Sequence, residues 1–381
     1  MIGDYEIVRY DSAQRSQVIQ LQTALWSNSL VLNAAYFHWK YETNPYVDEP
    51  IIYLAMHRGA VVGMRGFSGL ALETGEPGRA CRGLYADDAV VAPAHRGHGV
   101  MALIMRFAIA DLAAQGHDSL FNLSAGPATL KLSLQMGWCS AGWMRPMRRK
   151  SLQTRLRRKI RWLVGKVQWP IRSRNGQSKG GVAPSSTSLE DLDEFRIGLA
   201  TRRFPQITVT STARCTEMAI LVQQIAATGK LRHARDATYF RWRFANPLSR
   251  YRFLYWDEGG LDGYLVLHEY TSDRVDRELV NIVDWEARTP AMQAALLEVA
   301  SALTRRRVLT SWSAGLPRTT VDLLRSHGFR ADREPLDDLA VPSLIVRPLR
   351  AEPAADVFKI LGLDALNLAN WELRMLFSML G

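Results

Sequence analysis

The chain has 381 residues, 47% of them hydrophobic, and a mean hydropathy of −0.12, which predicts a globular protein with two domains and a substantial core. No apolar run approaches the roughly 18 residues of a membrane span, and the first residues hold no apolar signal region. The net charge is +11, and the three cysteines are far apart without metal spacing. We therefore expect a cytoplasmic protein with buried structural thiols and no bound metal.

An aromatic block precedes the first predicted strands. Residues 36–45 read Y-F-H-W-K-Y-E-T-N-P, and alternating apolar runs follow at residues 51–56 and 60–67. The alternation predicts a β-hairpin. Aromatic residues beside a turn-forming Asn-Pro either fix a loop against the core or stack on a ligand ring, and the sequence leaves both interpretations open.

The next predicted strand carries two neighbouring acids. Residues 83–93 read G-L-Y-A-D-D-A-V-V-A-P. Side chains alternate along a strand, so Asp87 and Asp88 are expected on opposite faces, and only one of them can face a cleft. That carboxylate would be a general base, and Tyr85, on the face of Asp87, is a second candidate. The alternative is a structural hydrogen bond or salt bridge.

A glycine turn joins this strand to a helix. Residues 90–100 read V-V-A-P-A-H-R-G-H-G-V, and an apolar-periodic segment follows from Met101. Free N–H groups and the positive dipole end at a helix N-terminus favour an anion, and Gly97 and Gly99 allow close backbone approach. The turn has neither Walker nor dinucleotide spacing. It predicts a pyrophosphate cradle, with an ordinary strand-to-helix turn as the alternative.

A basic segment separates the two halves of the chain. Thirteen positive residues and no acid lie between Arg145 and Lys179, so the remaining chain has a net charge of −2. Residues 151–167 have apolar side chains at helical spacing, and a Gly/Ser-rich linker runs to residue 189. A basic amphipathic helix suits the surface of an anionic membrane, which would place the protein peripherally at the inner face of the membrane. Docking on the protein itself is the alternative, and nucleic acid is disfavoured because no reading motif accompanies the charge.

The second half repeats the first. Residues 239–247 read Y-F-R-W-R-F-A-N-P, and two alternating apolar runs follow, as in the first half. Residues 123–138 and 312–329 both show a Ser-Ala-Gly turn, an amphipathic helix, and a glycine before an aromatic residue. Units of this length indicate a duplicated α/β domain and not a solenoid. The second half lacks the Arg-Gly-x-Gly turn and has Glu286 near its helix start, where it would repel a phosphate and could cap the helix amides.

The turn at residues 96–101 resembles the acyl-CoA-binding turn of the GCN5-related N-acetyltransferase (GNAT) superfamily, Arg/Gln-x-x-Gly-x-Gly/Ala. Arg96 and Gly99 match, whereas Met101 stands where the family has Gly or Ala. The order of elements in each half is also similar to the GNAT fold. The resemblance implies acetyl-CoA or another acyl-CoA as cosubstrate, with the pyrophosphate on backbone amides of the first half. The implied binding residues are Val90, Val91, Ala92, His95, Arg96, Gly97, His98, Gly99, Val100 and Met101.

The same resemblance implies the parts of an acyl-transfer site. The oxyanion donor is expected at the amide of Val90 or Val91. The tyrosine that serves as acid in the family is replaced by Ser133, and the family's asparagine position is Gly126. The catalytic candidates are therefore Asp87, Asp88, Tyr85 and Ser133.

We accordingly expect two tandem GNAT-like α/β (α+β) domains, each a mixed twisted sheet flanked by helices. The expected boundaries are residues 1–150 for the acyl-CoA-binding domain, 151–189 for the basic helix and linker, 190–350 for the degenerate domain, and 351–381 for a helical tail. Such chains resemble bacterial acyltransferases of surface-polysaccharide loci, which implies N-acylation of a small-molecule amine such as an amino sugar. An aminoglycoside acetyltransferase, a Fem-like aminoacyl transferase and a non-catalytic acyl-CoA-binding or membrane-associated protein remain open.

Overall fold

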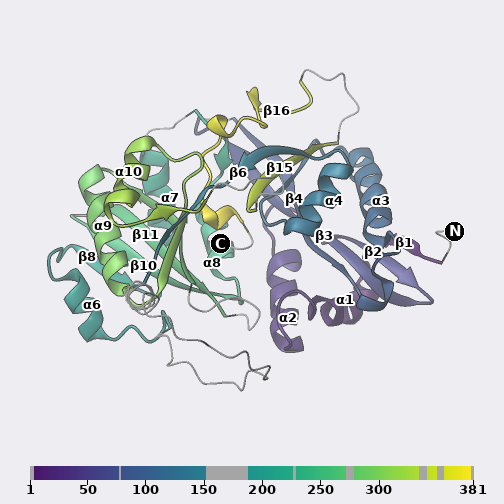
Figure 1. Ribbon diagram of the computed structural model, residues 1–381, viewed down its shortest axis with the longest axis horizontal. Coiled ribbons are helices and arrows are strands. Elements are labelled where there is room, and N and C mark those ends of the chain that lie inside the picture. The colour runs from purple at the N-terminus through teal and green to yellow at the C-terminus, as the bar shows by residue number, and fades with distance from the viewer. Residues whose placement is uncertain are drawn as a thin grey trace, which may run out of the picture.

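The computed structural model describes residues 4–76, 79–151, 188–225, 229–271, 279–333, 341–349 and 356–378. They form a mixed α/β structure in which two large sheets lie side by side, each flanked by helices (Figure 1). This confirms the predicted fold class. Within the described ranges, no helix is both long and apolar enough to cross a bilayer. The basic amphipathic helix predicted after residue 151 lies outside the described residues.

The first half of the chain supplies strands β1–β6 of the first sheet, strand β7 of the second sheet, and the helices around the first sheet. Its strands are β1 Glu6–Arg9, β2 Ile51–His57, β3 Ala60–Glu73, β4 Ala80–Val91, β5 Ser119–Asn122, β6 Cys139–Trp143 and β7 Pro146–Arg149. Its helices are η1 Ser12–Gln14, α1 Arg15–Gln22, α2 Leu30–Phe37, the π-helix η2 His38–Glu42, η3 Pro93–His95, α3 Val100–Ala114 and α4 Pro127–Gln135. The predicted hairpin is β2–β3, and the helix predicted after the glycine turn is α3.

The second half repeats this order. Its strands are β8 Ile207–Thr210, β9 Arg232–His233, β10 Ser249–Asp257, β11 Leu261–Tyr270, β12 Leu279–Ala287, β13 Val308–Trp312, β14 Arg330–Ala331 and β15 Ser343–Pro348. Its helices are α6 Glu194–Thr201, α7 Cys215–Gln224, α8 Ala237–Phe244, α9 Pro290–Leu303 and α10 Arg318–Ser326. The described part of the tail has strands β16 Lys359–Ile360 and β17 Leu363–Asp364 and the 3-10 helices η4 Leu368–Asn370 and η5 Met375–Phe377, where the sequence predicted a helical tail.

The central strand and helix of each half pack as their apolar spacing predicts. Ile104, Ala108 and Leu112 recur every four residues along α3 and are wholly buried. They pack with Leu84 and Ala86 of β4, so α3 covers one face of the first sheet. In the second half α9 packs in the same way with residues of β12. The opposite face of β4 therefore faces the second half.

Each sheet contains strands from the other half of the chain, and β9 of the second half also pairs with β3. β15 of the second half inserts between β5 and β6 of the first sheet, where Ile345 pairs with both Asn122 and Ser140. β7 of the first half inserts between β13 and β14, where Arg148 pairs with both Thr310 and Arg330. Each sheet thus needs a strand from the other half. The boundaries at residues 150 and 190 separate two sequence repeats, whereas the folded units interlock across them.

The repeated aromatic block forms the contact between the halves. Trp39 and Trp242 stack with ring centroids 4.9 Å apart and an interplanar angle of 11°. Trp39 Nε1 donates to the Trp242 carbonyl at 2.6 Å, and Trp242 Nε1 donates to the Trp39 carbonyl at 2.9 Å. The reciprocal pair joins equivalent positions of the repeat. Stacking of these tryptophans on a ligand ring, one of the two interpretations of the block, is therefore wrong, because each ring is covered by the other.

Candidate functional site

The glycine turn presents unpaired amides at the start of α3. Gly97 and Gly99 have φ angles of 81° and 72°, in the left-handed region that favours glycine, and no side chain caps the helix. Leu103 N donates to the Gly99 carbonyl, the first bond of the helix. Among the described residues, the N–H groups of residues 97–102 have no acceptor. The turn at residues 97–99 is exposed, so this helix end can receive an anion from solvent.

The side chains around the turn fold back against the first sheet. Arg96 Nε donates to the Val91 carbonyl at 3.0 Å. The His95 ring hydrogen-bonds the Tyr5 hydroxyl at 3.0 Å, and His98 is exposed. Arg96 is exposed, so both the backbone amides and the remaining guanidinium N–H groups can meet an incoming phosphate.

Strand β4 presents alternate amides to its two edges. Ala92 N donates to the Val62 carbonyl of β3 at 2.8 Å, so the Val91 N–H lies on the opposite edge and the Val90 N–H on the β3 edge. Of the two predicted oxyanion donors, only Val91 therefore faces the open edge of β4. The Ala92 N–H already donates to the Val62 carbonyl and cannot serve as a donor to a ligand.

That open edge arises because β4 and β5 diverge. The parallel pairing contains only Leu84 with Leu120 and Tyr85 with Phe121. Beyond it, side chains at the end of β5 and just after it bridge the two strands. Asn122 Nδ2 donates to the Ala86 carbonyl at 2.5 Å, and Ser124 Oγ donates to Asp87 Oδ1 at 2.7 Å. The gap leads from this point toward the amides of the glycine turn.

A bulge interrupts β4 at its two acids. The register with β3 shifts between Met64 and Gly66, and Asp88 has a φ angle of 46°. The bulge breaks the side-chain alternation, so the expectation that Asp87 and Asp88 point to opposite faces is wrong. Lys40 Nζ lies 2.9 Å from Asp88 Oδ1 and 3.4 Å from Asp87 Oδ2.

The two acids differ in what they can still bind. Asp88 accepts from Lys40 and from three further donors, which are Gln22 Nε2 at 2.9 Å, Trp26 Nε1 at 3.2 Å and Tyr41 OH at 2.8 Å. Asp87 accepts from Ser124 through Oδ1, whereas its buried Oδ2 has no hydrogen bond. Asp88 is therefore held as a structural anchor, and Asp87 keeps one oxygen for a proton or a ligand.

Lys40 is the residue of this site that sequence reasoning missed. Its side chain is 0% exposed, and its ammonium lies 5.3–5.6 Å from the rings of Trp26, Tyr36 and Tyr41. Burial and the charge of Asp88 raise the pKa of Tyr36 and Tyr41 well above 10, so both hydroxyls stay protonated. The signal was the repeat itself, because Lys40 aligns with Arg243 and both stand next to the paired tryptophans.

The remaining catalytic candidates lie on different faces of the first sheet. Tyr85 is buried toward the second half, with its ring 5.5 Å from that of His233. Burial raises the pKa of its hydroxyl well above 10. Ser133 is buried in α4, on the α3 side with Leu130. The structure thus brings Tyr85, Asp87 and Asp88 to one region and places Ser133 on another helix.

The described residues of the second half form no equivalent cradle at the start of α9. Thr289 caps α9 by accepting from Met292 N at 3.2 Å, so the expectation that Glu286 caps these amides is wrong. Glu286 is instead paired with Arg235 and Arg374, at 2.7 Å each. Its strand position makes it a partner of buried arginines, and it does not reach the helix start.

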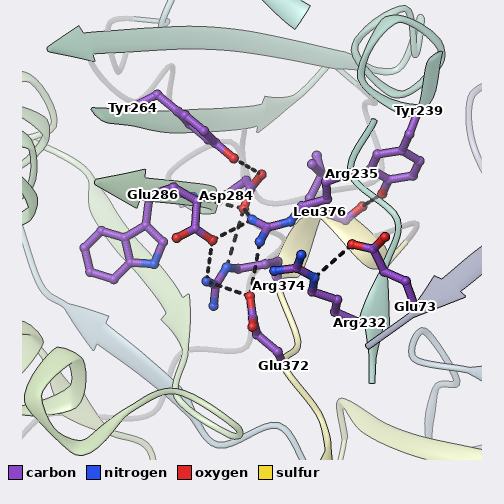
Figure 2. A network of polar contacts seen from close by, with 11 residues as sticks. Glu73, Arg232, Arg235, Tyr239, Tyr264, Asp284, Glu286, Glu372, Arg374 and Leu376 are labelled. Carbon is purple, nitrogen blue, oxygen red and sulfur yellow. Dashed lines mark hydrogen bonds and ion pairs between the residues drawn. The ribbon is translucent and has the colours of Figure 1, made fainter. Parts of the chain in front are cut away.

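In the second half, the C-terminal segment (residues 356–378) fills the place that corresponds to the gap beside β4 in the first half. A Cβ on Gly315, which follows β13, would lie 2.6 Å from the Trp371 carbonyl, and η5 packs against β12. Figure 2 shows the buried charges that hold the segment. Arg235 and Arg374 lie among three carboxylates, those of Asp284, Glu286 and Glu372. The segment and these ion pairs close the second half where the first half is open.

Two buried histidines make the fold sensitive to acid. Burial lowers the pKa of His233 to about 3 and that of His268 well below 6.5, and Arg243 lowers both further. Below pH 6.5 the unfolded chain binds protons that the folded chain does not, so stability falls as pH decreases. We expect a loss of about 1 kcal/mol per pH unit for each histidine between pH 6 and 4. Urea denaturation at several pH values measures it, and the slope should be shallower in His233→Phe. An identical slope in that variant would contradict the assignment.

No family model and no curated protein sequence matches the chain. Solved structures do match it. A GCN5-related N-acetyltransferase from Anabaena variabilis aligns at 12% identity with a TM-score of 0.55, over 91% of this chain and 73% of that chain. A probable N-acyltransferase from Enterococcus faecalis aligns at 13% identity with a TM-score of 0.54, over the same shares.

A tandem GNAT protein from the clavulanic acid biosynthesis pathway aligns along its whole length. The alignment has 12% identity and a TM-score of 0.50, and it covers 92% of this chain and 100% of that chain. At such low identity these likenesses establish architecture alone. The chain is therefore built from two tandem copies of the GCN5-related N-acetyltransferase fold.

Proposed function

We propose that the protein is an acyl-CoA-dependent N-acyltransferase with its coenzyme site in the first half. One observation carries the proposal: the unpaired amides of residues 97–102 lie at an exposed helix start directly beyond the gap between β4 and β5. A pyrophosphate can accept hydrogen bonds from such amides, and the extended part of an acyl-CoA can lie along the open edge of a strand. The names of the similar structures, N-acetyltransferase and N-acyltransferase, support the same reaction class.

Acyl transfer to an amine needs three things at the reacting centre. The amine must lose a proton, the carbonyl oxygen gains negative charge, and a thiolate leaves. Asp87 Oδ2 is buried without a hydrogen bond and is placed to accept the proton, while Ser124 fixes Oδ1. The Val91 N–H on the open edge is the donor for the carbonyl oxygen. Lys40 Nζ lies 3.4 Å from Asp87 Oδ2 and 2.9 Å from Asp88 Oδ1, so it forms ion pairs with both carboxylates.

For the acceptor we propose a small molecule with a primary amine, such as an amino sugar. It reaches Asp87 from the face of β4 opposite α3, because α3 covers the other face. Buried tyrosines and His233 surround that face, which gives a polar aromatic environment suited to sugars.

Thiol release with acetyl-CoA and a panel of primary amines tests the reaction. Turnover of at least one amine that depends on Asp87, measured with Asp87→Asn, is the expected result. Coenzyme binding without turnover of any amine would instead support a non-catalytic acyl-CoA-binding protein. Absence of coenzyme binding would contradict both.

A charge at the start of α3 should separate the two halves. Met101→Glu places a carboxylate at the second position of α3, next to the unpaired amides, and should weaken CoA binding at least about tenfold, or about 1.4 kcal/mol. Ala291→Glu, at the second position of α9, is the matched control and should leave the affinity unchanged. Isothermal titration calorimetry measures both. Equal losses in the two variants would argue against a site confined to the first half.

A further inference from the structure

Two histidines and a tyrosine gather beside the glycine turn. The ring centroids of His57 and His95 lie 4.9 Å apart, and that of Tyr5 lies 5.4 Å from His57 and 5.7 Å from His95. The Tyr5 hydroxyl hydrogen-bonds His95 Nδ1 at 3.0 Å, which leaves Nε2 of that ring unused. Within the described ranges, His95 Nε2 and both ring nitrogens of His57 make no hydrogen bond, and both residues are partly exposed. These three nitrogens are therefore available to a ligand from solution.

The cluster lies beyond the N-terminal end of α3. Tyr53 of β2 contacts Phe107, in the middle of α3, with ring centroids 5.9 Å apart. Ala55, two residues later on β2, packs with Val100, the first residue of the helix. His57 is two residues later again, and its contact with the tyrosine of the cluster, which packs on the same core, keeps it on the α3 face. This progression places His57 past the helix start, on the side to which the unpaired amides of the turn point.

The charged groups around the cluster leave its two imidazoles without an acidic partner. They are Asp4, Glu6, Arg58, Arg96 and His98, whereas residues 100–105 of α3 carry no charge. Glu6 pairs with Met56, so its side chain lies on the other face of the sheet from Tyr5 and His57. Asp4 is exposed, and no carboxylate of the described residues pairs with either imidazole. A protonated ring at this place would therefore take its counter-charge from a bound anion.

A phosphate changes the balance between the two charge states of these rings. Imidazole gains a proton between about pH 8 and pH 5. Two protonated rings this close repel each other, and the positive end of α3 repels both. A bound phosphate offsets all three positive groups and accepts charge-assisted hydrogen bonds from the rings. Binding therefore favours the protonated rings more than the free protein does, and it takes up protons from solution.

We propose that Tyr5, His57 and His95 form a phosphate subsite beside the turn, which takes up a proton when the coenzyme binds. The inference rests on the proposed function and adds its regulation: the affinity for CoA rises as the pH falls from about 8 to 6.5. His57 and His95 Nε2 donate to a phosphate of the coenzyme, either the pyrophosphate or the 3′-phosphate. Tyr5 is a positioning residue, because its hydroxyl holds the His95 ring.

Isothermal titration of the full chain with CoA and with 3′-dephospho-CoA, between pH 6.5 and 8, tests the subsite. The wild-type affinity for CoA should be at least about fivefold higher at the lower pH, since uptake of one proton can change it up to about tenfold per pH unit. His57→Gln and His95→Gln should each reduce this ratio to less than about twofold. The 3′-phosphate loses its second proton near pH 6, which by itself would strengthen binding as the pH rises, so the opposite trend reports on the protein.

The second ligand identifies the phosphate. If 3′-dephospho-CoA keeps the pH dependence, the subsite binds the pyrophosphate, and if it loses the dependence, the subsite binds the 3′-phosphate. Proton uptake is measured separately, because the heat of binding at pH 7 should differ between Hepes and Tris, whose ionisation enthalpies differ. This difference should also shrink in both variants and in Tyr5→Phe.

His117→Gln is the matched control. His117 follows α3 at its opposite end, so this variant should keep the wild-type pH dependence. Urea denaturation checks that the variants are folded. An unchanged pH dependence in both His57→Gln and His95→Gln, or an equal loss in His117→Gln, would overturn the subsite while leaving coenzyme binding intact. No binding of CoA at any pH would overturn the coenzyme site and the subsite together.

Discussion

Replacing Lys40 by methionine should lower the free energy of unfolding by about 3–5 kcal/mol, because it leaves two buried carboxylates without their cation. Asp88 would keep its neutral donors, whereas Asp87 Oδ2 would lose its ion pair with Lys40. The bulge of β4 should loosen as well. Urea denaturation at pH 7, followed by tryptophan fluorescence, measures the loss.

The control for Lys40 is a cation of the same half on the surface. Arg15 pairs with Glu42 at 2.7 Å, and their side chains are 38% and 28% exposed. Arg15→Met should cost less than about 1 kcal/mol, since water screens exposed pairs. A comparable cost for the two variants would contradict the assignment of Lys40 as the anchor of the bulge.

Replacing Arg235 by methionine should also cost about 3–5 kcal/mol. Its guanidinium contacts Asp284, Glu286 and Glu372 at 2.7–3.1 Å, and removing it leaves three buried carboxylates with Arg374 alone. Since Glu372 lies on the C-terminal segment, that segment should detach earlier than the sheets unfold. Proteolysis of the C-terminus during a urea titration, alongside fluorescence, measures both events.

Arg232→Met is the matched control for Arg235. Arg232 stands three residues earlier in the same stretch and pairs with Glu73, whose side chain is 26% exposed, at 2.9 Å (Figure 2). One partly exposed partner should make this change cost about 1 kcal/mol or less. If Arg232→Met destabilised the protein as much as Arg235→Met, the buried carboxylates would not be the cause.

Local patterns predicted the elements that position the site. The alternating apolar runs form β2–β3 and β10–β11, and the apolar-periodic segment forms α3. Gly137 and Gly328, which were predicted to end helices, follow α4 and α10 with φ angles of 80° and 84°. These features depend on neighbouring residues, which a single sequence records. The repeat also predicted two similar units, and the two sheets confirm it.

Long-range features could not be predicted in this way. Nothing near residues 146–149 indicates that β7 pairs in the second sheet, because its partners lie more than 150 residues away. The bulge at Asp88 depends on donors from α1, η2 and the loop between α1 and α2, so alternation along the strand gave the wrong faces. The aromatic block was visible, but its role required knowing that the two copies contact each other.

The central claim is that one chain binds one coenzyme, in the first half. Isothermal titration of the full chain with CoA tests it most directly, because the stoichiometry counts the sites. We expect one CoA bound per chain, with the heat of binding lost in Met101→Glu and retained in Ala291→Glu. A ratio of two, or binding that survives Met101→Glu and fails in Ala291→Glu, would contradict the claim.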